Sequence, residues 1–568
     1  MHHTTDPNLM VNLKINGIPV TVPGGTLILD AAKKVGINIP TLCYHPDLKV
    51  RATCRICLVE FKGQKKLRTA CSNEVWEGAE IITNSKIVRD TRRTVLELLL
   101  AEHKPDCLQC VRNTKCELQR LAKELSVEET SFISAGHSFE IEDQHPAIVR
   151  DPNKCIKCGR CVEVCQDVQQ VSAINTAHRS AEFEIGTPYH QKLDQTTCVS
   201  CGQCIAVCPV GALYEKDDTG KVQTALDNPG IHVVVQIEPA IRVALAKEFD
   251  IMPGNITPGK MVTVLRRLGF NKVFDTRFMT DITSREAAYE LFDRLCNNGV
   301  LPMLTSHCAG WINFMEKTYP EILNHLSTCK SPQQMFGAIA KTFYAEQSGI
   351  SPEKIFVVSI MPCVAKKYEG ARTEMSASGQ RDVDAVLTTK ELVKMIKHGY
   401  LDLAKLEESE FDDPLGISED DMVICGSSGG VMEGAVRTVY TELTGYDLEQ
   451  FDFEAIPDLE GAKEADINIA GQVLKVAIVD GLKNARVLMD QIKQGSSKYH
   501  MIEVMCCPIG CSNNVRQPFG TTAEIEAPIY QGHKSPAVLT LYGKFLGNPL
   551  GPKSQELLHT NYIPQYRK

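Results

Sequence analysis

The spacing of the cysteines constrains this chain more than any other feature of its sequence. Nineteen of its 23 cysteines fall into five groups, and four of these groups are compact and follow one another from the N-terminus. Disulfide scaffolds are usually short secreted domains, whereas CxxC pairs in a chain of 568 residues are typical of metal ligation. We therefore expect thiolate-bound metal centres in a reducing compartment, the cytoplasm of an anaerobe.

The composition excludes several classes of partner. The net charge of -9 argues against a nucleic-acid or anionic membrane partner. No apolar stretch is long enough for a membrane span, and the N-terminus has no hydrophobic segment of signal-peptide type. The length favours several domains, of mixed α+β and α/β class.

The first cysteine group lies in a small β domain that we expect over residues 10–84. Alternating apolar residues flank Asn16-Gly17, which predicts a hairpin, and a helix is predicted over 27–35 with Thr26 as its N-cap. This order is typical of a β-grasp ferredoxin-like domain. The C-x10-C-x2-C-x13-C spacing departs from the plant-type C-x4-C-x2-C. It resembles the 2Fe–2S domain at the start of respiratory complex I subunits and of multi-cluster hydrogenases, which implies one 2Fe–2S cluster with the ligands Cys43, Cys54, Cys57 and Cys71.

The second group is expected in a domain over residues 85–145. An amphipathic helix is predicted over 87–102, and the pattern H-x3-C-x2-C-x5-C follows it. Imidazole replaces thiolate on iron in some clusters, so the pattern predicts a 4Fe–4S cluster. A zinc site with the same ligands is the alternative. In either case the ligands are His103, Cys107, Cys110 and Cys116.

The third and fourth groups form an internal repeat within a two-cluster ferredoxin domain, expected over residues 146–228. Residues 155–165 and 198–208 both follow C-x2-C-x2-C-x3-C. In such pairs the fourth cysteine of each run binds the other cluster. The first 4Fe–4S cluster is then held by Cys155, Cys158, Cys161 and Cys208, and the second by Cys165, Cys198, Cys201 and Cys204.

The fifth group is scattered through an α/β region that we expect over residues 229–520. Apolar strand candidates lie at 301–305, 354–361 and 501–505, and one cysteine closely follows each of them. Ligands collect at the carboxyl ends of strands in open α/β sheets, so these side chains are expected to share one pocket. The set is Cys308, Cys363, Cys507 and Cys511. The four cysteines outside all groups are expected to be small buried residues: Cys296, Cys329, Cys425 and Cys506.

Three motifs carry a family resemblance: TSHCAGW (305–311), MPCVAKKYE (361–369) and EVMCCPIGCSNNVRQP (503–518). By these motifs the region resembles the catalytic, H-cluster domain of FeFe (iron-only) hydrogenases, and 521–568 is similar to their small-subunit segment. The upstream groups resemble those of the multi-cluster, NAD-linked and electron-bifurcating members.

The resemblance implies roles for individual residues. Cys308, Cys363, Cys507 and Cys511 would hold a 4Fe–4S cluster, and Cys511 would bridge it to a diiron unit that carries CO, cyanide and a dithiolate amine. Lys366 would hydrogen-bond a cyanide. The remaining cavity residues would be Met361, Met505, Gln333, Pro239 and Ala240.

The departures from the family pattern fall around the diiron position. The family motif TSCCPGW becomes TSHCAGW, so His307 replaces the cysteine that passes protons to the diiron amine. Ala287 stands where the relay has an acidic residue. A phenylalanine becomes Cys425, and the glycine-rich tail becomes the bulkier 514–518. The distal relay positions persist as Glu290, Arg294 and Ser327.

These features predict an iron–sulfur oxidoreductase subunit that carries electrons between ferredoxin, a flavin/NAD(H) module and a terminal cubane, with impaired or absent H2 chemistry. No nucleotide-binding motif occurs in the chain, so we expect a flavin/NAD(H)-binding subunit as partner. The resemblance to electron-bifurcating hydrogenases and related formate dehydrogenase complexes implies a small 2Fe–2S subunit and a formate dehydrogenase subunit as further candidate partners. The alternative is a competent FeFe hydrogenase that uses His307 in a modified proton path. A sensory role is the third interpretation.

Overall fold

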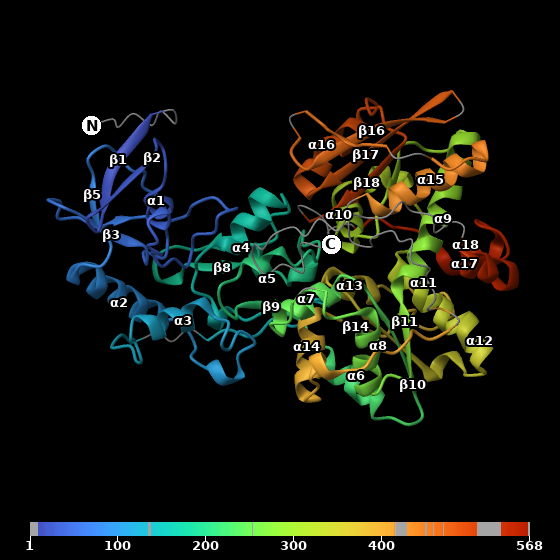
Figure 1. Ribbon diagram of the computed structural model, residues 1–568, viewed down its shortest axis with the longest axis horizontal. Helices are drawn as coiled ribbons and strands as arrows, with labels where there is room; N and C mark the ends of the chain where they lie inside the picture. Colours follow the sequence, from blue (N-terminus) through green and yellow to red (C-terminus); the bar gives the residue numbers. More distant parts are fainter. Residues whose placement is uncertain are drawn as a thin grey trace. The chain divides into compact units, whose positions relative to one another are not determined.

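The computed structural model describes residues 9–133, 138–252, 254–413, 415, 429–448, 451–457, 459–469, 471–507 and 535–565. The chain forms two compact units, one of Met1–Thr196 with Gln203–Tyr214 and the other of Thr197–Gly202 with Glu215–Lys568. In Figure 1 the first unit is coloured blue to teal, and the second is mainly green to red. None of the described helices is both long enough and apolar enough to cross a membrane.

The first unit begins with a five-stranded mixed sheet. Its order is β2-β1-β5-β3-β4, formed by β1 (Met10–Ile15), β2 (Ile18–Pro23), β3 (Leu58–Phe61), β4 (Arg68–Thr69) and β5 (Glu80–Ile82). The predicted hairpin is confirmed: β1 and β2 pair antiparallel, and Asn16 and Gly17 both have positive φ in the turn between them. The apolar face of α1 (Ile28–Lys34) packs on this sheet.

The predicted N-cap of α1 is wrong. Leu27 occupies the N-cap position and no side chain caps the helix. The Thr26 hydroxyl instead donates a hydrogen bond to the Pro23 carbonyl oxygen at 2.7 Å. The turn after β2 therefore uses the hydroxyl that the sequence pattern assigned to the helix.

Short helices and cysteine loops make up the rest of the first unit. Helix α2 (Lys86–Ala101) has Ser85 as N-cap and ends just before His103, as the sequence predicts. It is followed by α3 (Glu117–Glu124) and α4 (Arg160–Glu163), and α5 (Gln203–Val207) returns the chain to this unit. Between the two ferredoxin-type runs, β7 (Asn175–Ala177) and β8 (Glu184–Gly186) form a small hairpin.

The second unit contains two sheets. The first is fully parallel, in the order β11-β10-β13-β14, with β10 (His232–Ile237), β11 (Lys272–Asp275), β13 (Ile355–Ile360) and β14 (Ala385–Leu387). Neighbouring residues of β10 belong to two different apolar cores: Val234 to one, Val233 and Val235 to the other. Helices α7 (Ile241–Glu248), α8 (Pro258–Arg267) and α14 (Thr389–His398) supply the second core.

The second sheet is mixed and has the order β12-β18-β17-β16-β15. Its strands are β12 (Met303–Thr305), β15 (Glu454–Ala455), β16 (Ala462–Ile469), β17 (Gln472–Asp480) and β18 (Met501–Met505). Strands β12, β18 and β17 run parallel to one another. Strand β16 pairs antiparallel with both β17 and β15. Helix α15 (Gly430–Thr444) lies along the long helix α9 (Thr276–Cys296) (Figure 1).

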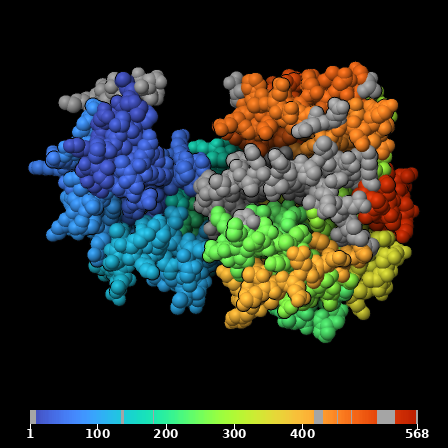
Figure 2. Space-filling view, in the orientation of Figure 1, coloured from blue at the N-terminus to red at the C-terminus, as the bar shows by residue number. Residues whose placement is uncertain are grey.

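The C-terminal helices α17 (Pro536–Leu541) and α18 (Pro552–Leu558) belong to the second unit. Figure 2 shows them in red on its surface. Phe545 packs against Phe343, with ring centroids 5.1 Å apart. The segment after α18 is held by a backbone hydrogen bond from Thr560 to Thr328. The end of the chain thereby helps to close the core near α11 (Pro332–Ile339).

Candidate functional site

The four cysteines of the first group converge in the loops beside the first sheet, and all are buried. The Sγ atoms of Cys57 and Cys71 lie 3.3 Å apart, and the Cys54 amide donates to the Cys43 Sγ at 3.5 Å. Hydrogen bonds from the Cys54 and Cys71 thiols lower the pKa of Cys43. The set has the donor chemistry and the spacing of a thiolate metal site.

His103 is positioned by the backbone two residues beyond α2. Its Nδ1 lies 3.1 Å from the Lys154 carbonyl oxygen, and its side chain is buried. A hydrogen bond of this kind fixes the tautomer and leaves Nε2 as the metal-binding nitrogen. Burial lowers the pKa of His103, which keeps the imidazole neutral, as ligation requires.

Cys208 lies with the first ferredoxin-type run, as the crossed ligation rule predicts. It lines one cavity together with Cys155, Cys158 and Cys161. Burial, followed by the neighbouring thiols, raises the pKa of Cys161 well above its usual value. Four thiols this close together in an apolar setting are stable as thiolates only when a metal compensates their charge.

The second predicted set is divided between the two units. Cys165 and Cys204 belong to the first unit, and Cys198 and Cys201 belong to the second. This cluster therefore stays a prediction from the repeat.

Three of the scattered cysteines lie at the carboxyl ends of strands in the second unit. Cys308 follows β12 as the N-cap of α10 (Ala309–Thr318), Cys363 lies between β13 and α13 (Ala365–Gly370), and Cys507 follows β18. The strands come from both sheets, yet the thiols meet. The pKa of Cys363 is raised mainly by burial, and further by the nearby Cys507 and Cys308 thiols. Cys511 lies outside the described residues, as do Cys425 and 514–518.

Of the cysteines outside the five groups, Cys329 and Cys506 are buried as expected, but Cys296 is exposed at the end of α9, so the expectation of burial is wrong there. Cys506 is also a member of this site, a role that its sequence position did not indicate. Hydrogen bonds with Cys201, Cys308 and Cys507 raise its pKa well above the usual value. The hydrogen bond with Cys506 in turn lowers the pKa of Cys308 to about 6, which favours the thiolate that binds iron. One thiol thus touches a predicted ferredoxin-type ligand and two ligands of the terminal site.

The backbone approaches closely around this contact. A Cβ at Gly310 would lie 3.0 Å from the Cys506 Sγ and 3.4 Å from the Val199 carbonyl oxygen. A Cβ at Gly202 would lie 2.3 Å from Val364 Cγ2, and Gly202 also has φ +74°. Glycine is therefore required at Gly202. These close approaches hold the 197–202 segment against the strand ends that carry Cys363 and Cys507.

Lys366 and Gln333 lie together beside the thiol site. Lys366 Nζ donates to the His307 carbonyl oxygen at 2.7 Å and pairs with Glu369 at 2.9 Å. Gln333 Nε2 donates to the same Glu369 carboxylate at 3.0 Å. Glu369 ends the motif MPCVAKKYE without an assigned role, although its i,i+3 spacing from Lys366 is a usable signal for this pairing.

The buried polar atoms around the site fit a bound polar group. The His307 Nδ1 and Nε2 atoms and the Gln333 Oε1 atom have no hydrogen-bond partner among the described residues. Such orphaned atoms are rare in native proteins unless a ligand or water satisfies them. Burial, followed by the Lys366 charge, lowers the pKa of His307 to about 3. Met361 and Met505 are buried.

The three persisting relay positions lie together in the structure. Glu290 accepts hydrogen bonds from Arg294 and Ser327, each at 2.7 Å. Arg294 also donates to carbonyl oxygens in the segment before Ser327. Ala287, one turn earlier on α9, is buried in the apolar core and carries no proton.

A buried carboxylate beside Ala287 serves a different role. Burial opposes ionisation of Glu286, but hydrogen bonds from His559, Ser554 and Tyr542 outweigh it and lower the pKa. The His559 Nε2 lies 3.0 Å from Glu286, and its Nδ1 lies 2.8 Å from the Thr328 hydroxyl. Glu286 therefore anchors the C-terminal segment to α9.

The predicted backbone wall at Pro239 and Ala240 lies at the start of α7. The Ala240 amide donates to Glu238 at 2.8 Å. Burial raises the pKa of Glu238 to about 8, and its Oε1 has no hydrogen-bond partner among the described residues. A neutral carboxyl at the carboxyl end of β10 is a further polar group that the sequence analysis did not identify.

Five family models match successive regions of the chain between residues 8 and 565. Residues 231–514 match the C-terminal domain of the iron only hydrogenase large subunit, and 522–565 match the iron hydrogenase small subunit. Residues 8–86 match a 2Fe-2S iron-sulfur cluster binding domain. Residues 92–131 match the iron-sulfur binding region of NADH-ubiquinone oxidoreductase-G, and 145–214 match the ferredoxin-like domain of NADH-quinone oxidoreductase subunit 3.

Individual relatives extend over most or all of the chain. The NADP-reducing hydrogenase subunit HndD of Solidesulfovibrio fructosivorans is 42% identical over 98% of this chain and 100% of its own. Iron hydrogenase 1 of Clostridium pasteurianum is 36% identical over 97% and 100%. A solved variant of FeFe-hydrogenase HydA1 from Chlamydomonas reinhardtii covers 61% of this chain and 99% of its own, at 35% identity and a TM-score of 0.57. The chain is an iron–sulfur oxidoreductase that belongs to the FeFe, or iron-only, hydrogenase family.

Proposed function

We propose that this chain carries electrons between ferredoxin, a flavin/NAD(H) module and a terminal cubane in an electron-bifurcating complex. The contact of Cys506 with Cys201 on one side and with Cys308 and Cys507 on the other carries the proposal. It joins a ligand of the ferredoxin-type repeat to the terminal thiols with no intervening side chain. Such a contact suits rapid electron exchange between two clusters.

The proposed cofactors are one 2Fe–2S cluster, three 4Fe–4S clusters upstream and a 4Fe–4S cluster at the terminal site. His103 would be the single nitrogen ligand, through Nε2. At the terminal site, Cys308, Cys363 and Cys507 would hold the cubane together with Cys511. A diiron unit, when bound, would supply the chemistry of H2. Lys366, Gln333 and His307 would then face that unit, because their polar groups converge beside the thiols.

The residues at the predicted relay positions favour the proposal that H2 chemistry is impaired. The burial and low pKa of His307 keep its imidazole neutral at pH 7, and the buried Ala287 offers no titratable group at the relay position before Glu290. Proton transfer requires positioned groups or waters at each step. The competing proposal, a competent hydrogenase, is favoured by the orphaned His307 nitrogens, which a diiron ligand or a water would satisfy.

The proposed partners follow from the relatives and from the chain itself. One relative is a subunit of an NADP-reducing hydrogenase, and the 92–131 and 145–214 regions match parts of NADH oxidoreductases. A flavin/NAD(H)-binding subunit and a small 2Fe–2S subunit would complete such a complex. A formate dehydrogenase subunit is a further candidate that would be tested by copurification.

Infrared spectroscopy of anaerobically prepared protein, coexpressed with hydrogenase maturation enzymes, tests the proposal. CO and cyanide bound to iron absorb where protein does not. The electron-conduit proposal predicts clusters without these bands, or bands with little hydrogen uptake to a viologen dye. Strong bands together with rapid hydrogen uptake would support the competent hydrogenase.

A further inference from the structure

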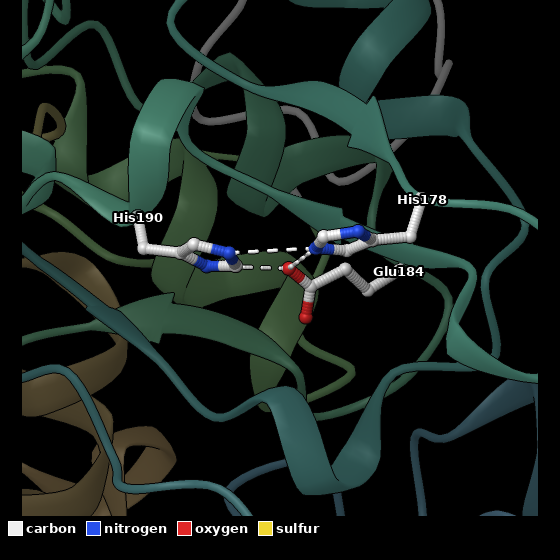
Figure 3. A group of neighbouring side chains, drawn as sticks. All are labelled: His178, Glu184 and His190. Atoms are coloured by element: carbon white, nitrogen blue, oxygen red, sulfur yellow. Dashed lines mark hydrogen bonds and ion pairs between the residues drawn. The ribbon is translucent and has the colours of Figure 1, made fainter.

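The insertion between the two ferredoxin-type runs brings two histidines and a glutamate together on the surface of the first unit. His178 directly follows β7, Glu184 begins β8 opposite Ala177, and His190 ends a short 3₁₀ turn (Pro188–His190). Figure 3 shows the two imidazole rings side by side with the Glu184 carboxylate at their edge. Their centroids lie 5.6 Å apart and their planes differ by 19°.

One nitrogen of each histidine and one oxygen of Glu184 lie close enough together to share a cation. The two Nε2 atoms are 3.4 Å apart. Glu184 Oε1 lies 4.0 Å from His178 Nε2, and one ligand atom from each of the three residues lies within 4.8 Å of the other two. The shorter distance of 3.4 Å between Glu184 and His190 involves Nδ1, and an imidazole offers only one nitrogen to a given ion. Strong hydrogen bonds to nitrogen are shorter, at about 2.7–3.2 Å. A tetrahedral ion with ligands at about 2.0–2.1 Å holds its ligand atoms about 3.4 Å apart.

We infer that His178, Glu184 and His190 form a binding site for a divalent cation of the zinc class. Two imidazoles and one carboxylate are a ligand set that zinc accepts. The set contains no thiolate, so it does not favour soft ions or an iron–sulfur cluster. Among the described residues, the two imidazoles are the only basic groups within 4.0 Å of the Glu184 carboxylate.

The exposure of the three side chains defines the kind of site. Glu184 is 18% exposed, whereas His178 and His190 are 47% and 65% exposed. The carboxylate is therefore held by the hairpin, and the open side leaves a fourth position for water. A bound ion would connect the β7–β8 hairpin to the segment that leads to Cys198, and would stabilise the insertion.

Zinc titration of the intact, cluster-loaded protein by calorimetry under anaerobic conditions tests the site. Wild type should bind one Zn²⁺ in the micromolar range or tighter. His178→Ala, His190→Ala and Glu184→Gln should each weaken binding by at least the roughly 10- to 100-fold seen when even an outer-shell partner of a ligand is lost. His398→Ala removes another exposed histidine and should leave the isotherm unchanged.

A second measurement separates this site from damage to the clusters. Zinc K-edge absorption of the loaded wild type should show only nitrogen and oxygen neighbours, and the iron–sulfur absorbance should stay constant during titration. The inference is overturned by sulfur neighbours, by millimolar binding only, or by an isotherm that the three substitutions leave unchanged. If a variant loses its clusters, zinc protection of the 178–190 segment from protease in wild type decides instead.

Discussion

At the scale of single residues, the predicted ligands are held by atoms that ligand spacing does not identify. The Lys154 carbonyl oxygen orients His103, and the Cys506 thiol contacts two ligands of the terminal site and one of the repeat. Loss of such an outer contact typically costs about 10- to 100-fold in metal affinity or activity. Lys154 is distant from His103 in sequence, and Cys506 adjoins Cys507 but is distant from Cys201 and Cys308, so ligand spacing alone does not reveal these contacts.

His103 is expected to set the reduction potential of its cluster. His103→Cys should keep the cluster and lower its potential, because a thiolate donates more charge to iron than an imidazole does. His103→Ala should lose the cluster or weaken its binding. Electron paramagnetic resonance during a redox titration measures both. If both variants titrate like wild type, His103 is not a ligand.

Cys506 is expected to tune the terminal cubane through its hydrogen bonds. Hydrogen bonds to ligand sulfurs raise a cluster's potential, so Cys506→Ala should lower it by an amount on the order of tens of millivolts while the iron content stays unchanged. Cys296→Ala is the matched control, because Cys296 is an exposed cysteine. Equal potentials in wild type and Cys506→Ala would contradict the contact.

At the scale of elements, strands were more predictable than the connections between them. The apolar runs predicted β12, β13 and β18 closely, because buried parallel strands are apolar on both faces. Their division into two sheets depends on pairing between distant segments. The tie between Glu286 and His559, 273 residues apart, likewise leaves no local signal. Among the terminal thiols, only Cys308, Cys363 and Cys507 could be compared with the structure.

The N-terminus of α15 is held by a buried carboxyl. Glu503 accepts hydrogen bonds from the amides of Met432 at 2.7 Å and Gly429 at 3.2 Å. Burial nevertheless raises the pKa of Glu503 from 4.5 to about 7. The folded protein therefore binds this proton more tightly than the unfolded chain does. The resulting stability is complete below about pH 4.5 and is lost as the pH rises through 7.

Glu503→Gln should remove this pH dependence. The amide keeps an acceptor for the helix but does not ionise. Between pH 5 and pH 8, the free energy of unfolding should therefore fall by roughly 3 kcal/mol less in the variant than in wild type. Thermal unfolding at several pH values, followed anaerobically, measures the difference. Glu346→Gln, on an exposed part of the chain, should behave like wild type. Parallel pH profiles of wild type and Glu503→Gln would show that Glu503 is ionised in the folded protein.

At the scale of the whole molecule, the chain combines iron–sulfur electron-transfer domains with a terminal domain of the iron-only hydrogenase family, in which we propose that the proton path is altered. The upstream domains match parts of NADH oxidoreductases, and the terminal domain matches iron-only hydrogenases. In our proposal, electron transfer requires only the cluster sites, whereas H2 turnover also requires a proton path through the positions that hold His307 and Ala287. Loss of the second function would leave the first intact.

The most direct test compares two rates in the assembled complex, for wild type and for His307→Ala. We predict that electron transfer from NADH to ferredoxin is nearly equal in the two proteins, and that H2 turnover is slow in both. Rapid H2 turnover in wild type that falls by about 100-fold or more in His307→Ala would contradict the account, because a loss of that size is expected for a general acid–base group.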